Sequence, residues 1–83
     1  MTVDAHYIVR RNELRSDLRD LDRVALKAAA MTDDGVTMEA GSEGTIVGIW
    51  RDGEAYEVEF AEPAGALATV EATDLRLVKR ANA

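Results

Sequence analysis

The step from Asp52 to Gly53 constrains this chain more than any other feature. Asp-Gly between two runs of alternating residues predicts a β-hairpin, here within residues 44–60. A two-residue type I′ turn needs positive φ at both central residues, which glycine adopts freely and aspartate tolerates. We therefore expect two antiparallel strands joined at this step, with the rest of the chain packed against them.

This turn pairs Ile49 with Tyr56 and Val47 with Val58. Because side chains alternate across a strand, the hairpin has one apolar face and one mixed face. The predicted core face carries Val47, Ile49, Tyr56, Val58 and Phe60. The predicted outer face carries Ile46, Gly48, Trp50, Ala55, Glu57 and Glu59. A three-residue loop with a bulge at Gly53 would set Val47 against Glu57, so we favour the two-residue turn.

Residues 1–20 differ in pattern from the rest and are interpreted as an N-terminal arm. Arginines recur every four positions, at Arg11, Arg15, Arg19 and Arg23, and leucines follow a helical spacing at Leu14, Leu18 and Leu21. This pattern predicts a helix over residues 12–20, with Asn12 as its N-cap. Residues 3–10 either extend that helix backwards or form a short strand at residues 7–9.

The remaining strands are short and separated by turn signals. We expect a first strand at 21–28, a loop at 31–40, a fourth strand at 67–71, one helical turn at 72–75, a closing strand at 76–78 and a flexible tail at 79–83. This order predicts a mainly β fold, a small five-stranded SH3-like barrel over residues 21–78 with an N-terminal helical arm.

Four blocks of the chain resemble a known family. They are residues 21–26 (LDRVAL), 44–47 (GTIV), 52–60 (DGEAYEVEF) and 73–77 (TDLRL). They resemble an uncharacterised bacterial family, domain of unknown function 4926, over roughly residues 18–78. The resemblance implies a small SH3-like barrel without an established activity, and the arm and the polar loop at 32–37 depart from the family pattern. The block at 44–47 is also similar to a short pattern in nitrile hydratase β-subunits and in ribosomal and transcription-elongation barrels.

The composition limits the classes of partner. The chain has 83 residues, no cysteine and a formal net charge of −6, which predicts one domain stabilised by packing alone. Residues 32–83 hold four Lys/Arg against eleven Asp/Glu, so we expect no nucleic-acid binding there. No apolar run is long enough for a membrane span or a secretory signal, and we expect a cytoplasmic protein.

Residues typical of catalysis or metal binding are sparse. His6 is the single histidine, and serine occurs only at Ser16 and Ser42, so we expect no metal site, cofactor or catalytic triad. Glu57 and Glu59 share a strand face, but an open face does not perturb carboxyl pKa values as catalysis requires. The sequence therefore predicts a protein that is not an enzyme.

The outward-facing Trp50 is expected to be covered either by the N-terminal arm of the same chain or by a protein partner, since tryptophan is enriched at binding hot spots. The predicted partner-binding residues are Trp50, Ile46, Glu57, Glu59, Tyr7, Leu14, Arg15 and Leu18. The leading hypothesis is a non-enzymatic interaction module, a small accessory subunit or adaptor, with homodimerisation through the arm as an alternative. Two further hypotheses are an acidic antitoxin or immunity protein that neutralises a basic toxin, and a small subunit or chaperone of a nitrile-hydratase-like metalloenzyme.

Overall fold

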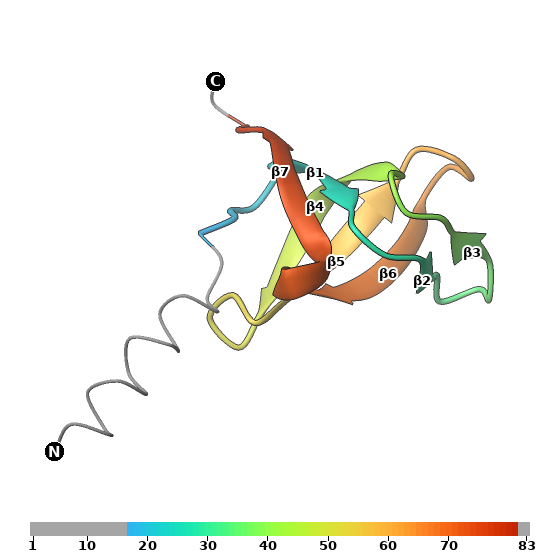
Figure 1. Ribbon diagram of the computed structural model, residues 1–83, viewed down its shortest axis with the longest axis horizontal. Coiled ribbons are helices and arrows are strands. Elements are labelled where there is room, and N and C mark those ends of the chain that lie inside the picture. Colours follow the sequence, from blue (N-terminus) through green and yellow to red (C-terminus); the bar gives the residue numbers. More distant parts are fainter. Residues whose placement is uncertain (1–16, 82–83) are drawn as a thin grey trace, which may run out of the picture.

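The computed structural model describes residues 17–81, which form seven strands and one 3₁₀ turn (Figure 1). The elements are β1 (Arg23–Leu26), β2 (Ala30–Met31), β3 (Thr37–Met38), β4 (Glu43–Trp50), β5 (Ala55–Phe60), β6 (Ala66–Glu71), η1 (Ala72–Asp74) and β7 (Leu75–Lys79). The predicted strands and the single helical turn before the last strand are confirmed. The predicted loop at 31–40 instead contains the end of β2 and all of β3, which pair as a two-stranded antiparallel ribbon that the sequence did not predict.

Five of the strands form one antiparallel sheet in the order β6-β5-β4-β1-β7. The mainly β fold and the five-stranded sheet are thus confirmed. The sheet is open, because β6 and β7 lie at its two edges and do not pair with each other. The closure implied by a barrel is therefore absent from the described strands.

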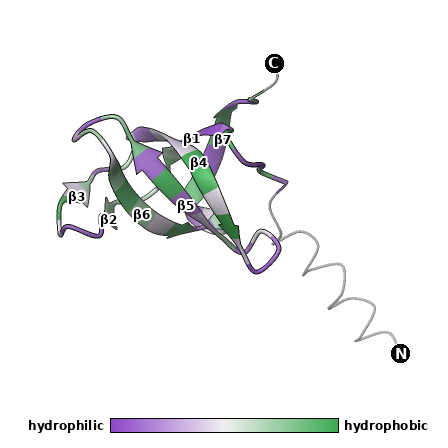
Figure 2. Ribbon diagram, turned by 180° about the vertical axis from the view of Figure 1, so that it is seen from behind, coloured by the Kyte–Doolittle hydropathy of each residue, from purple (hydrophilic) through white to green (hydrophobic). Residues whose placement is uncertain are grey.

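The core is lined by apolar residues of the sheet, and buried residues alternate with less buried ones along β5 and β6 (Figure 2). Its fully buried large side chains come from the central strands, and Tyr56 and Phe60 are the bulkiest of them. The other core residues are Leu18, Val24, Leu26, Ile46, Val58, Ala66, Ala68, Val70, Ala72 and Leu75.

A β-bulge in β4 overturns part of the predicted hairpin register. Ile49 pairs with Tyr56 as predicted, but the register shifts between Ile46 and Gly48, so that Ile46 rather than Val47 lies opposite Val58. Counted outward from the hairpin turn, one extra residue in a strand moves the side chains beyond it to the other face. Ile46 is consequently buried in the core and Val47 is exposed, so the prediction of Ile46 as an outer contact residue was wrong.

The hairpin turn is longer than predicted. The backbone has positive φ at Arg51, Asp52 and Gly53, and the carbonyl of Trp50 accepts hydrogen bonds from the N–H groups of Gly53 and Glu54. The strands end at Trp50 and Ala55, so Arg51 and Glu54 belong to the turn instead of forming a pair. The hairpin is confirmed, whereas the two-residue form of its turn was wrong.

The start of the described chain corrects the last part of the helix predicted over 12–20, whereas residues 12–16 lie outside the described residues. Residues 17–20 are not helical and end in a turn at Asp20 and Leu21. Leu18 packs into the core and its carbonyl accepts a hydrogen bond from the hydroxyl of Tyr56 at 3.3 Å. Its prediction as an exposed contact residue was therefore wrong. The three predicted contact residues of the arm, Tyr7, Leu14 and Arg15, lie outside the described residues.

Candidate partner-binding face

Trp50 lies at the end of β4, on the outer side of the sheet, with 54% of its surface exposed. Its indole N–H donates to the Oε1 of Glu57 at 3.4 Å, and the Thr69 hydroxyl donates to the same oxygen at 2.7 Å. These contacts connect β4, β5 and β6 across the outer side of the sheet. They connect an exposed aromatic ring to its neighbours, and the outward placement of Trp50 predicted from the alternation of the hairpin is confirmed.

Gly48 provides the space for this arrangement. It lies on the same side of β4 as Trp50 and pairs directly with Glu57. A Cβ placed at Gly48 would lie 3.2 Å from the Cβ of Glu57, which is tighter than ordinary packing. With no side chain at this position, the Glu57 carboxylate and the indole can approach each other above the strand.

A hollow of about 460 Å³ lies beside the indole. Its lining residues are Trp50, Arg51, Glu54, Ala55, Thr69 and Glu71. An aromatic wall next to carboxylates suits a lysine or arginine side chain of a partner, through charge attraction and cation–π contact. We call this hollow and the Trp50–Glu57–Thr69 group the Trp50 face.

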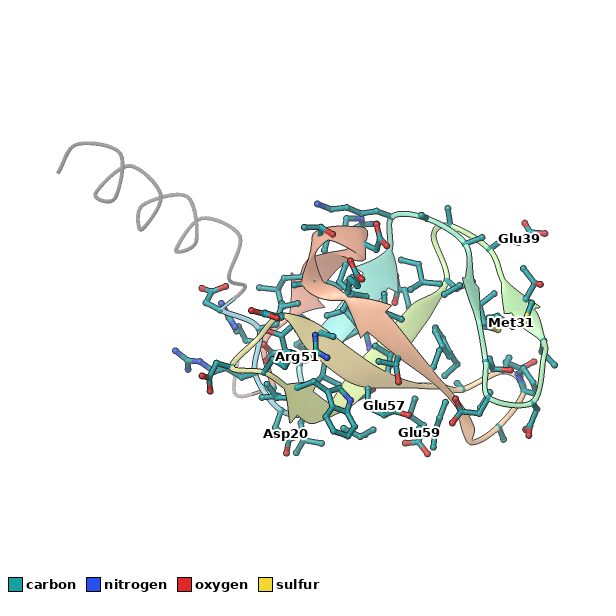
Figure 3. The ribbon with its side chains drawn as sticks, turned by 90° about the horizontal axis from the view of Figure 1, so that it is seen from below. Asp20, Met31, Glu39, Arg51, Glu57 and Glu59 are labelled. Carbon is teal, nitrogen blue, oxygen red and sulfur yellow. The ribbon has the colours of Figure 1, made fainter. Side chains whose placement is uncertain are left out.

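Glu59 extends the acidic character of the same side of the sheet. It pairs with Thr45 on β4 and Leu67 on β6 and is exposed to solvent. Figure 3 shows Arg51 at the opposite end of the molecule from Met31 and Glu39, with Glu57 and Glu59 between them. Of the predicted contact residues, Trp50 and Glu57 are in contact, and Glu59 lies on the same side of the sheet.

A family model described as Domain of unknown function (DUF4926) matches residues 20–77. The chain belongs to this family. The DUF4926 resemblance predicted from the sequence blocks is confirmed, with nearly the predicted bounds. No curated protein and no solved structure matches the chain.

The DUF4926 segment contains a buried carboxylate that sequence reasoning missed. Asp22 is 1% exposed and accepts hydrogen bonds from the N–H groups of Arg19 and Ala81, at 2.8 and 3.0 Å, and from Arg80 at 2.8 Å. Burial raises the pKa of Asp22, but these hydrogen bonds and the charge of Arg80 outweigh it and lower the pKa below its ordinary value. Arg80 also pairs with Asp17 at 3.0 Å.

This Asp22 cluster joins the start of the described chain to the end of β7. Arg80 and Ala81, which the sequence assigned to a flexible tail, are therefore anchored. Burial would lower the pKa of Arg80, yet the hydrogen bond to Asp22 and the charge of Asp17 raise it above its ordinary value. We assign the cluster to stability rather than to binding, because each of its hydrogen bonds is satisfied within the chain.

The described residues contain neither a metal-binding cluster nor a membrane-spanning helix. Within residues 17–81 no three His, Cys, Asp or Glu side chains come together as a metal site would require. No helix in the same part of the chain is long and apolar enough to cross a membrane.

Proposed function

We propose that this DUF4926 chain is a non-enzymatic interaction module that binds another protein through the Trp50 face. In this proposal it acts as a small accessory subunit or adaptor. The observation that carries the proposal is an exposed indole held by Glu57 and Thr69 across three strands. A large aromatic side chain that is already ordered loses little entropy on binding, which is typical of a hot-spot residue.

The topology supports an SH3-like domain as the scaffold. A five-stranded order of β6-β5-β4-β1-β7, with a single 3₁₀ turn before the last strand, suits a partly open SH3-like barrel. Binding through side chains on a rigid sheet needs no catalytic group.

The charge of the described chain favours a basic partner. Residues 17–81 contain seven Lys/Arg and fourteen Asp/Glu, and the Trp50 face includes Glu54, Glu57 and Glu71. Such a surface attracts basic proteins over long range and raises their association rate. This acidity also supports a second candidate function, that of an antitoxin or immunity protein that neutralises a basic toxin.

The proposal is tested by affinity purification from the source organism with wild type, Trp50→Ala and Met31→Ala. Met31 is a matched control because it is an apolar residue with 63% exposure on β2, at the opposite end of the molecule. We expect one stoichiometric partner to bind wild type and Met31→Ala, and to bind Trp50→Ala at least tenfold more weakly, as for a typical hot spot.

Salt separates the two candidate functions. A basic toxin held by charge should associate roughly tenfold more slowly when ionic strength rises from about 0.05 M to about 0.5 M. A partner recovered equally well by Trp50→Ala would refute the Trp50 face as the contact. A rate of association independent of salt would refute the toxin-neutralising function alone.

A further inference from the structure

The two edge strands of the sheet, β6 and β7, differ in how far other segments of the chain cover their backbone groups. At the β6 edge the backbone N–H of Asp33 donates to the carbonyl of Leu67 at 2.8 Å, and the β2 segment packs beside β6 (Figure 1). At the opposite edge β7 pairs with β1 alone, and no other strand within residues 17–81 lies along its outer side. A strand edge of this kind presents unpaired N–H and C=O groups that an added strand can bind.

The side chains along β7 divide into an apolar set and a basic set. Leu77 pairs with the core residue Val24 yet is 38% exposed, and Val78 is 39% exposed. The register shifts at Val78, between the pairs Val24–Leu77 and Arg23–Lys79. In a regular strand positions 76 and 79 would point to opposite sides, but this bulge places Arg76 and Lys79 on the same outer side.

These two cations are not neutralised by the described chain. Arg23 pairs with Glu43 at 3.4 Å, and Arg80 pairs with Asp17 and Asp22. Arg76 and Lys79 make no ion pair with any residue from 17 to 81. A basic edge therefore stands on a domain whose described residues carry twice as many acidic as basic side chains.

A second hollow lies beside the C-terminal end of β7, across β1 and β4. It measures about 290 Å³ and is lined by Leu21, Arg23, Thr45, Lys79, Arg80 and Ala81. Three of these side chains are cationic, so a carboxylate entering the hollow would meet positive charge at short range.

We infer that the β7 edge binds an extended segment of an acidic protein partner by strand addition. In such a segment apolar side chains pack against Leu77, and the alternate Asp or Glu side chains face Arg76 and Lys79. A second copy of this chain is a poor occupant, because pairing β7 with itself brings four cations together. This edge is separate from the Trp50 face and takes a partner of the opposite charge.

The test uses a fluorescein-labelled peptide with the sequence GEVEVEVEG and the full-length protein, with anisotropy as the readout. We expect saturable binding, weakened at least tenfold in Kd by Arg76→Glu combined with Lys79→Glu. The matched control is Arg51→Glu, a cation of the hairpin turn, which should change the Kd less than twofold. Trp50→Ala should also leave the Kd unchanged, so failure here and failure of the Trp50 face are distinguishable.

Two altered peptides complete the test. The basic peptide GKVKVKVKG should bind at least tenfold more weakly because its lysines face Arg76 and Lys79. The peptide GEVEPEVEG should also lose at least tenfold, since proline cannot donate a backbone hydrogen bond to the edge. Equal binding of any of these peptides, an unaffected Kd in the doubly reversed variant, or no binding of the first peptide overturns the inference.

Discussion

The Trp50 face and the β7 edge are two surfaces of one sheet with opposite character. The first is an aromatic residue among carboxylates, held in place by side-chain hydrogen bonds across three strands. The second is a partly aliphatic strand edge that, within residues 17–81, pairs on one side only and carries two cations without an ion pair. The difference shows that net charge describes this small domain poorly, because its two surfaces carry charges of opposite sign.

Gly44 lies on β4, between the two surfaces, and its substitution should have the largest effect on stability. A Cβ at Gly44 would lie 2.6 Å from Cγ1 of Val58 and 2.8 Å from the carbonyl oxygen of Glu59. Gly44→Ala should therefore lower the free energy of unfolding by about 3 kcal/mol, since the backbone of β5 must shift. Urea denaturation checks this, with Gly48→Ala as a milder control, and an unchanged midpoint would contradict it.

Removal of the Asp22 carboxylate should destabilise the β7 edge more than the Trp50 face. Asp22→Ala leaves two backbone N–H groups and Arg80 without their partner, and should cost about 2 kcal/mol. Amide exchange should accelerate at β7 more than at β5. Asp20→Ala, at an exposed turn position, is the control, and equal acceleration in both strands would contradict the assignment.

The pH dependence of stability follows from the same carboxylate. The pKa of Asp22 is lower in the folded chain than in the unfolded chain. Its contribution to the free energy of unfolding is therefore complete above the ordinary aspartate value of about 3.9. It is lost as the pH falls through the folded pKa. Asp22→Asn should thus be less stable near neutral pH and show a shallower loss of stability in acid, measured by denaturation at several pH values.

Replacement of Leu21 should have a smaller effect on stability, and it should stabilise the fold. It is an exposed leucine with φ of 70°, a conformation that costs an ordinary residue about 1–2 kcal/mol. Leu21→Gly should raise the free energy of unfolding by about 1 kcal/mol, after the entropy cost of glycine is counted. Leu77→Gly, within strand β7, should lower it. A destabilised Leu21→Gly variant would show that this backbone is not strained.

The smallest effect concerns the order of the Trp50 indole. Thr69→Val removes one hydrogen bond to Glu57 at the surface and should change stability by less than about 0.5 kcal/mol. The indole should nevertheless move more freely, which lowers the fluorescence anisotropy of the single tryptophan. Thr73→Val, on the 3₁₀ turn, serves as the control. Unchanged anisotropy would show that Thr69 does not order the ring.

Local sequence signals were sufficient to predict most of this fold. The Asp52–Gly53 step located the hairpin, and alternation correctly assigned Tyr56, Val58 and Phe60 to the core. Trp50, Glu57 and Glu59 were likewise assigned to one face. Each of these predictions depends on residues that are close together in the chain.

The predictions that failed depend on interactions that local patterns do not encode. The bulge at Val47 leaves alternation intact on both sides of it, so nothing in the residues of β4 signals that Ile46 turns inward. Asp22 binds Arg80, which is 58 positions away, and the helical spacing of the leucines cannot show that Leu18 packs under Tyr56. Such contacts are fixed by the tertiary fold.

The central claim is that Trp50 is the contact residue for a protein partner, and site-specific photo-crosslinking in the source organism tests it most directly. A benzophenone amino acid is placed at position 50 in one strain and at the control position 31 in another. We predict one discrete crosslinked product from position 50, absent from position 31 and strongly reduced by Glu57→Lys with Glu59→Lys. No product from position 50, or the same product from both positions, would contradict the account.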